Sequence, residues 1–238
     1  MFVGHYGVAL ALKKADPRLS LGTLFLAAQF VDILWGIFLI LGWEQVRVDP
    51  GYTAVTPFQF LSYPLSHSLV AGVLWAIVVG AAYYSRPTID SSHRRRGAIV
   101  LGVAVLSHWL LDALVHLPDL PLAGSDSLKV GLGLWDSIGA TYALEYGLLA
   151  VGVWIYVGTK TKRHPLRTAR LAILIGLLLA FSVVNLWAPP PNNMTLIGAS
   201  AIVMYLGIAW LGSWVDRDPP HEPDSETHRH KRKSKAAR

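Results

Sequence analysis

Long apolar runs alternate along this chain with short connections that carry most of its charged residues. A helix needs about 20 apolar residues to cross the hydrocarbon core of a bilayer, and six runs reach or approach that length. The pattern predicts an all-α fold, a polytopic membrane helix bundle that occupies residues 1–215. The expected spans are Leu19–Leu41, Pro64–Tyr84, Gly97–Leu117, Leu134–Val157, Thr168–Trp187 and Met194–Trp214.

The composition supports the membrane class. Hydrophobic residues make up 53% of the 238 positions and charged residues only 15%, with a mean hydropathy of +0.43. A soluble domain carries about 25% charged residues. The chain has no cysteine, which excludes disulfides and thiolate metal ligands, so a bound metal would need nitrogen and oxygen ligands.

Positive residues gather in every second connection. The placement of these residues between apolar runs indicates membrane topology, so the formal charge of +6 does not point to nucleic acid, and we expect no nucleic-acid partner. By the positive-inside rule, both termini are expected in the cytoplasm. Tryptophans at the expected ends of spans, such as Trp43, Trp135 and Trp187, are typical of aromatic belts. The basic positions are Lys13, Lys14 and Arg18, then Arg86 and Arg94–Arg96, then Lys160, Lys162, Arg163, Arg167 and Arg170, and finally the tail.

The two ends of the chain depart from this pattern. Met1–Leu12 is apolar but too short to span, and we expect a helix that re-enters the membrane from the cytoplasmic side. The alternative is an interfacial helix lying on the membrane surface. Residues 216–238 are basic and rich in charge and proline, and are expected to form a disordered cytoplasmic tail.

Ionisable residues inside the apolar runs are the candidates for function. His108, Asp112 and His116 are spaced four apart and would share one stripe of a helix. Charged groups at membrane depth are costly and usually face a bundle interior, a cavity or an ion. Two imidazoles and a carboxylate are also ligand types of zinc. A neutral hydrogen-bonded pair of His108 with Asp112, and a solvated His116, remain open alternatives.

Four more ionisable residues come from other segments and fall at similar expected depths. His67 stands between two serines, Asp32 lies inside the first run, and Glu145 lies inside the fourth. His5 joins them if the N-terminal segment re-enters the membrane. Glu145 could be protonated and packed, or could serve as a general base or last ligand. Gln29 and Ser107 lie next to these groups and would orient the imidazoles.

At these residues the chain resembles the bacterial membrane-bound, metal-dependent hydrolases. The matching elements are Gly4-His5, Val31-Asp32, Ser66-His67-Ser68, and Ser107-His108 through Asp112. Two further segments are similar in sequence to a subgroup of uncharacterised bacterial membrane proteins. They are His116-Leu-Pro-Asp119 and Lys129 through Trp135. The likeness covers most of residues 1–158 and implies a multi-pass protein of the bacterial inner membrane.

Together these features predict a hydrolase of a lipid or another amphiphilic ester or phosphoester. The expected cofactor is a divalent metal, zinc first and manganese as the alternative, bound by His67, His108 and Asp112, with Asp32, His5 and His116 as further ligands. Glu145 or Asp32 would take the proton. Membrane lipids are the expected partners. The alternatives are a proton- or cation-coupled transporter and a non-catalytic scaffold.

Overall fold

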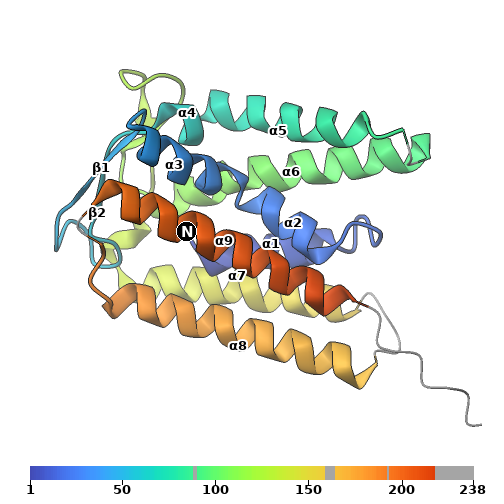
Figure 1. Cartoon of the computed structure of the whole chain (residues 1–238). Coiled ribbons are helices and arrows are strands. Elements are labelled where there is room, and N and C mark those ends of the chain that lie inside the picture. Colours follow the sequence, from blue (N-terminus) through green and yellow to red (C-terminus); the bar gives the residue numbers. More distant parts are fainter. Residues whose placement is uncertain (88–89, 159–163, 192, 218–238) are drawn as a thin grey trace, which may run out of the picture.

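A computed structural model describes residues 1–87, 90–158, 164–191 and 193–217. The chain is mostly helical, and its long helices lie side by side in a bundle (Figure 1). The predicted disordered tail lies outside the described residues from position 218 onward.

Within the described residues, four helices are long and apolar enough to cross a membrane, as the hydrophobic pattern predicted for residues 91–216. Helix α5, Leu69–Tyr84, is apolar but has 16 residues and is shorter than these four helices. The four candidate spans are α6 (Ser91–Val115), α7 (Ile138–Gly158), α8 (Pro165–Trp187) and α9 (Met194–Asp216).

The first expected span is broken in two. Helix α2 covers Leu21–Ala28, helix α3 covers Phe30–Leu41, and the two meet at Gln29 with a bend of 53°. Ser20 caps the start of α2 by accepting a hydrogen bond from the backbone of Thr23. The last carbonyls of a helix lack partners within it, so the break leaves the Ala28 carbonyl available to another part of the molecule.

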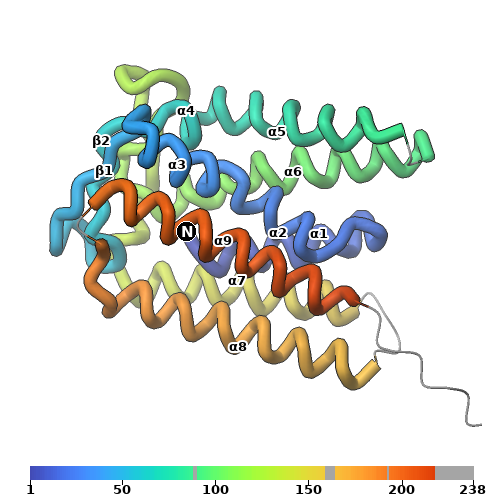
Figure 2. The backbone as a smooth tube through the Cα atoms, in the orientation of Figure 1, coloured from blue at the N-terminus to red at the C-terminus, as the bar shows by residue number. Residues whose placement is uncertain are grey.

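The N-terminal segment forms helix α1, Val3–Leu12, which lies inside the bundle and packs chiefly against α7, α2 and α6 (Figure 2). Burial of this helix contradicts the alternative of a helix lying on the surface. Close packing on α7 depends on glycine, because a Cβ added at Gly152 would overlap the carbonyl oxygen of Gly7.

Helix α9 packs against both halves of the broken span through small residues. A Cβ at Gly22 would collide with the α9 backbone at Ala209, and Gly36 and Gly198 meet in the same manner further along. Helices α2 and α3, on either side of the bend, therefore each approach α9 closely at a glycine.

Short strands and turns close one end of the bundle (Figure 1). Strand β1 pairs antiparallel with β2, and β3 pairs antiparallel with β4. Helix α4 connects β2 to α5. The bounds are β1 Gln45–Val48, β2 Phe58–Ser62, α4 Pro64–His67, β3 Leu120–Pro121, β4 Lys129–Val130 and the 3₁₀ helix η1 Leu134–Asp136.

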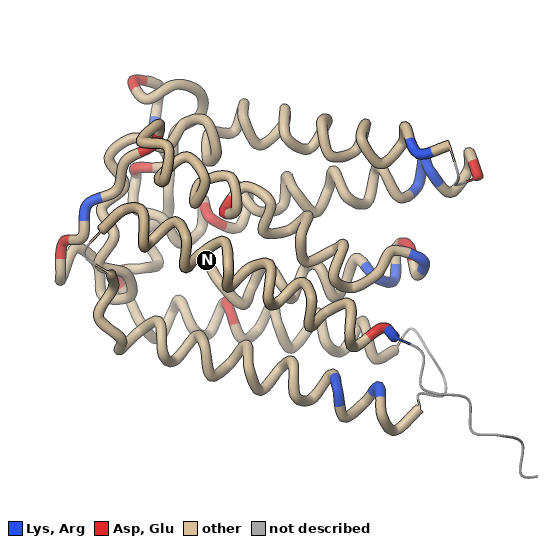
Figure 3. The backbone as a smooth tube through the Cα atoms, viewed as in Figure 1, with Lys and Arg blue, Asp and Glu red and all other residues tan. Residues whose placement is uncertain are grey.

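Lysines and arginines concentrate at the opposite end, around the α1–α2 turn, the α5–α6 connection, the start of α8 and the end of α9 (Figure 3). There the ammonium group of Lys13 lies 2.6 Å from the carboxylate of Asp216. Among the tryptophans expected in the belts, Trp43, Trp187 and Trp210 are exposed. Trp135 is buried instead, because its ring packs 4.2 Å from that of His116, so the prediction of a lipid-facing position was wrong for this residue.

Candidate metal centre

Helix α6 supplies the central pair of the site. His108 and Asp112 are both buried, and Nε2 of His108 lies 3.1 Å from Oδ2 of Asp112. The helix ends at Val115, yet His116 keeps to the same stripe as its C-terminal cap residue. Its Nε2 lies 3.9 Å from the same Asp112 oxygen. The three residues are therefore together and buried, and His116 is not solvated.

Three other segments bring their polar residues to this pair. From α1, His5 places Nε2 3.3 Å from Oδ1 of Asp112, and its ring stacks on that of His108 at 3.8 Å. From α4, Nε2 of His67 lies 3.2 Å from Oδ1 of Asp32, which α3 supplies. The same Asp32 oxygen is 3.7 Å from Nε2 of His108. All six predicted ligands thus form one connected cluster.

In His67, His108 and His116, the ring nitrogen Nδ1, which points away from the cluster, is hydrogen-bonded to an oxygen atom. Nδ1 of His108 donates to the Ala28 carbonyl at 2.7 Å, the group that the break at Gln29 exposes. Nδ1 of His116 lies 2.9 Å from Oδ1 of Asp119. Since a carbonyl and a carboxylate only accept, both Nδ1 atoms carry the proton and both Nε2 atoms present a lone pair to the cluster.

His67 is oriented by a longer chain of hydrogen bonds. The hydroxyl of Ser66 donates to Glu44 at 2.6 Å and therefore accepts from Nδ1 of His67, which lies 2.7 Å away. Burial raises the pKa of the Glu44 carboxyl, while its hydrogen bonds from Ser66 act to lower it. Nε2 of His67 consequently also faces the carboxylates with its lone pair.

The arrangement fits a metal ion. Ligand atoms bound at about 2.0–2.2 Å cannot lie more than about 4.4 Å apart across the ion, and the nitrogen–oxygen distances of 3.1–3.9 Å fall inside that limit. Two groups have ligand atoms within 4.8 Å of one another, His5 with His108 and Asp112, and Asp32 with His67 and His108. Nε2 of His108 is buried without a hydrogen-bond donor or acceptor among the described residues, as a ligand nitrogen would be.

The negative charges of Asp112 and Asp32 are balanced by different groups. The amino group of Met1 donates to Oδ1 of Asp112 at 2.7 Å. Asp32, within the described residues, has only the imidazoles of His67 and His108 at ion-pair distance, and it interacts with the hydroxyl of Tyr205. A carboxylate removed from water without a cation is costly, so the Asp32 side of the cluster favours a cation most.

Glu145 lies at the edge of the cluster, where it anchors α1. Its carboxylate accepts hydrogen bonds from the backbone of Phe2 at 3.0 Å and of Gly4 at 3.1 Å. These are amide groups of the first turn of a helix, which have no partner within the helix and attract an anion. Neither group of possible ligands contains Glu145. Its catalytic role stays a prediction.

Sequence reasoning missed the groups that orient the imidazoles. Gln29 and Ser107 were expected there, but Ser107 bonds the carbonyl of Ala104 on its own helix, and Gln29 makes no hydrogen bond to an imidazole within the described part of the chain. Glu44, Ser66 and Asp119 take this role instead. The signal for Glu44 was slight: an acidic residue directly after the end of an apolar run.

Aromatic residues from the closed end cover the His116 side. Phe60 of β2 lies 5.0 Å from the His116 ring. The hydroxyl of Tyr63 donates to Asp119 at 3.1 Å, and burial together with the Asp119 charge raises the pKa of Tyr63 above its usual range. Tyr63 therefore remains a donor to Asp119, and the cluster is shielded from solvent at this end.

Comparisons with protein-family models, with curated proteins and with solved structures find no match to this chain.

Proposed function

We propose that this protein is a metal-dependent hydrolase of the membrane that acts on a lipid or another amphiphilic ester or phosphoester. One observation carries the proposal: four imidazoles direct Nε2 toward buried Asp112 or half-buried Asp32, and three of them are fixed from behind by oxygen acceptors. Such backing is what orients histidines that ligate metals.

His67, His108, Asp112, Asp32 and His5 would hold a divalent ion, with His116 at the margin. Nitrogen and carboxylate ligands suit zinc, and manganese is the alternative. When bound, the ion would supply a Lewis acid that polarises the scissile bond and acidifies a water molecule. Because Nδ1 of His108 is committed to Ala28, its Nε2 can serve one ion, on either the His5 side or the Asp32 side.

The residues of the chain provide the remaining chemistry. Asp32 lies at ion-pair distance from two imidazoles of the cluster, whereas Glu145 lies at its edge, so Asp32 is the better placed of the two proposed bases. Glu145 would contribute mainly by fixing α1, which carries His5 into the site. The surrounding aromatic residues exclude water, which strengthens every electrostatic interaction inside.

The membrane arrangement is part of the proposal. Counting the bent pair α2–α3 and the shorter α5 as spans gives six, with α1 re-entrant between them. The end rich in lysine and arginine would face the cytoplasm by the positive-inside rule, which puts the end of α9 there, whereas the amino group of Met1 lies inside the bundle against Asp112 and not at that end as predicted (Figure 3). A bacterial inner membrane fits this arrangement, and substrate would reach the site from the lipid.

The test is elemental analysis of detergent-purified protein beside His108→Ala and Asp112→Ala, with Asp136→Ala at the end of η1 as the matched control. We expect zinc or manganese near one ion per chain in the wild type and the control, and at least about a tenfold loss in both site variants. Size-exclusion profiles would show that the variants remain folded.

A lipid-hydrolysis screen would follow with the metal-loaded protein. A folded wild type that takes up no metal after reloading would contradict the metallohydrolase, and proton or cation flux in proteoliposomes would then support the transport alternative. Metal uptake with no product from any lipid class would restrict the cluster to binding.

A further inference from the structure

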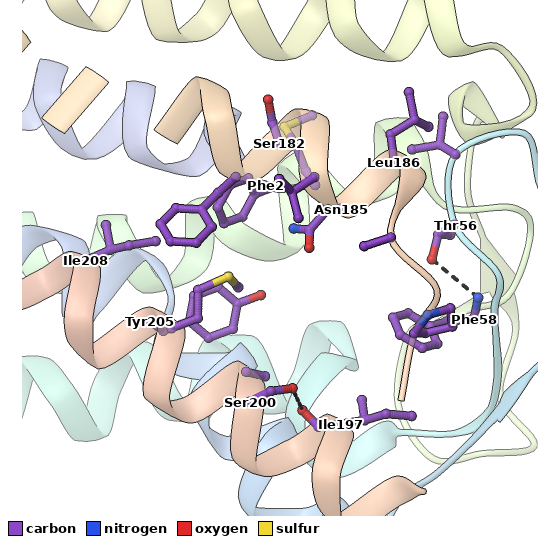
Figure 4. Close-up of a pocket in the computed structure, with 18 of the residues that line it drawn as sticks. Phe2, Thr56, Phe58, Ser182, Asn185, Leu186, Ile197, Ser200, Tyr205 and Ile208 are labelled. Atoms are coloured by element: carbon purple, nitrogen blue, oxygen red, sulfur yellow. Dashed lines mark hydrogen bonds between the residues drawn. The ribbon is translucent and has the colours of Figure 1, made fainter. Parts of the chain in front are cut away.

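A cavity of about 880 Å³ lies beside the metal cluster, between α8 and α9 and next to the start of α1 (Figure 4). The α8–α9 turn and the β1–β2 loop close one end of it. Figure 4 shows Phe2, Tyr205 and Asn185 around the open space, with Ser182 and Ile208 along its length. Its volume lies within the range of small-molecule pockets, about 300–1,000 Å³.

The shape and chemistry of the lining favour an alkyl chain. Ser200, Met204, Gly207 and Leu211 form one stripe of α9 along the cavity. From Ile197 to Leu211 this stripe is about 21 Å long by the rise of an α-helix. The lining is mainly apolar, and an apolar cavity does not hold ordered water well. A long, narrow apolar space accommodates an extended hydrocarbon chain better than a compact polar solute.

The cavity opens to the outside of two candidate membrane spans. Its rim includes Val184 on α8 and Val203 and Trp210 on α9, all of them exposed. Around these helices the solvent is the hydrocarbon of the bilayer. Lipid chains are therefore the species present at high concentration at this opening.

Two residues connect the cavity to the cluster. Tyr205 lines the cavity, and its hydroxyl and the Asp32 carboxylate influence each other electrostatically. Met1 also lines it and contacts Asp112. A chain lying in the cavity would therefore bring its polar end toward the Asp32 side of the ligands.

We propose that this cavity binds one acyl chain of a membrane lipid and presents the ester or phosphoester end of that lipid to the cluster at Tyr205. The statement about reaction rests on the proposed hydrolase, whereas acyl-chain binding does not. The occupant is a lipid of the surrounding bilayer, because the opening lies on the membrane-facing side of α8 and α9.

Photo-crosslinking tests the binding directly. The full chain is reconstituted into phosphatidylethanolamine and phosphatidylglycerol vesicles that contain a phospholipid with a diazirine near the end of one acyl chain. Illumination and peptide mapping should label residues of the cavity lining, above all Phe2 at the start of α1 and Ile208, which is 3% exposed and so is shielded from lipid surrounding the protein.

Two glycine variants form a matched pair. A side chain at Gly207 would enter the cavity, and one at Gly176 on α8 would not, while neither added Cβ meets another atom. Gly207→Leu should lower labelling of Phe2 and Ile208 by at least about tenfold, since overpacking a filled site is strongly disfavoured, and Gly176→Leu should leave it unchanged.

Each outcome bears on the proposal. Labelling confined to outward residues such as Val203, and equal in both variants, would overturn it and show surrounding lipid only. Metal content should be the same in Gly207→Leu and the wild type. Interior labelling in a protein that binds no metal would retain the acyl-chain site and reject the hydrolase, so the two failures are distinguishable.

Discussion

Helices α6 and α8 are both long and apolar, but they occupy different environments. In α6, 44% of the most apolar stretch is buried within the protein, against 22% in α8. The buried helix carries His108 and Asp112, and α8 contributes apolar residues and Asn185 to the cavity wall. Hydropathy alone does not separate a helix at the centre of a bundle from one at its edge, whereas the position of ionisable residues does.

The molecule thus has two regions. One is a polar centre formed by α1, α3, α4 and α6, and the other is the apolar cavity between α8 and α9. Helix α1 belongs to both, because His5 faces the cluster and Phe2 faces the cavity. Substitutions can therefore be chosen that affect one region, or both together.

The largest effect is expected from Gly152→Leu on α7. The new side chain would collide with the backbone of α1 at Gly7, and overpacking of this kind costs about 1–3 kcal/mol. Displacing α1 should remove His5 from the cluster and Phe2 from the cavity, so both metal content and interior lipid labelling should fall. Gly147→Leu, on the same helix where an added Cβ meets nothing, is the control. Loss of only one property would show that α1 does not join the two regions.

A smaller effect, limited to the polar centre, is expected from Ser66→Ala. This change removes the hydroxyl that holds Nδ1 of His67 and leaves Glu44 without a donor side chain. Loss of an orienting partner typically lowers metal affinity by about 10–100-fold. Competition with a fluorescent chelator would measure it, and Ser62→Ala, which removes an exposed hydroxyl, should bind metal as the wild type does. Equal affinities in the two variants would refute the orienting role of Ser66.

The smallest effect is expected from Asp119→Asn. The amide oxygen can still accept from Nδ1 of His116, and that imidazole lies furthest from the carboxylates, at 3.9 Å. Metal affinity should fall by less than about tenfold, with lipid labelling unchanged. Asp126→Asn in the β3–β4 loop provides the comparison. A loss as large as that of His108→Ala would move His116 from the margin of the site to its centre.

Much of the cluster could be predicted from the sequence because ionisable residues are rare in apolar runs. His108 and Asp112 share a stripe by helical spacing alone, and His5, Asp32 and His67 were found as the other polar residues at similar depth. That these segments face one another required the structure, since depth along a helix does not reveal which face is turned inward.

Other features had no signal in the hydrophobic pattern. The break at Gln29 occurs without proline or glycine at the junction, so the first run reads as one continuous span. Trp135 resembled a belt residue by position, but its neighbour in space is His116, which is 19 residues away in the sequence. Both differences arise from tertiary packing that local spacing does not encode.

The anchoring of α1 by Glu145 has a consequence for the order of assembly. The backbone of Phe2 and its acceptor are 143 residues apart in the chain, so the Glu145 anchor of α1 forms only after α7 has been synthesised. Chains are made from the N-terminus at about 5–20 residues per second, which leaves the start of α1 without this anchor for about 7–30 seconds. We therefore expect His5 to be fixed in the ligand set late in biogenesis, and arrested nascent chains that end before α7 should bind metal more weakly than the full chain.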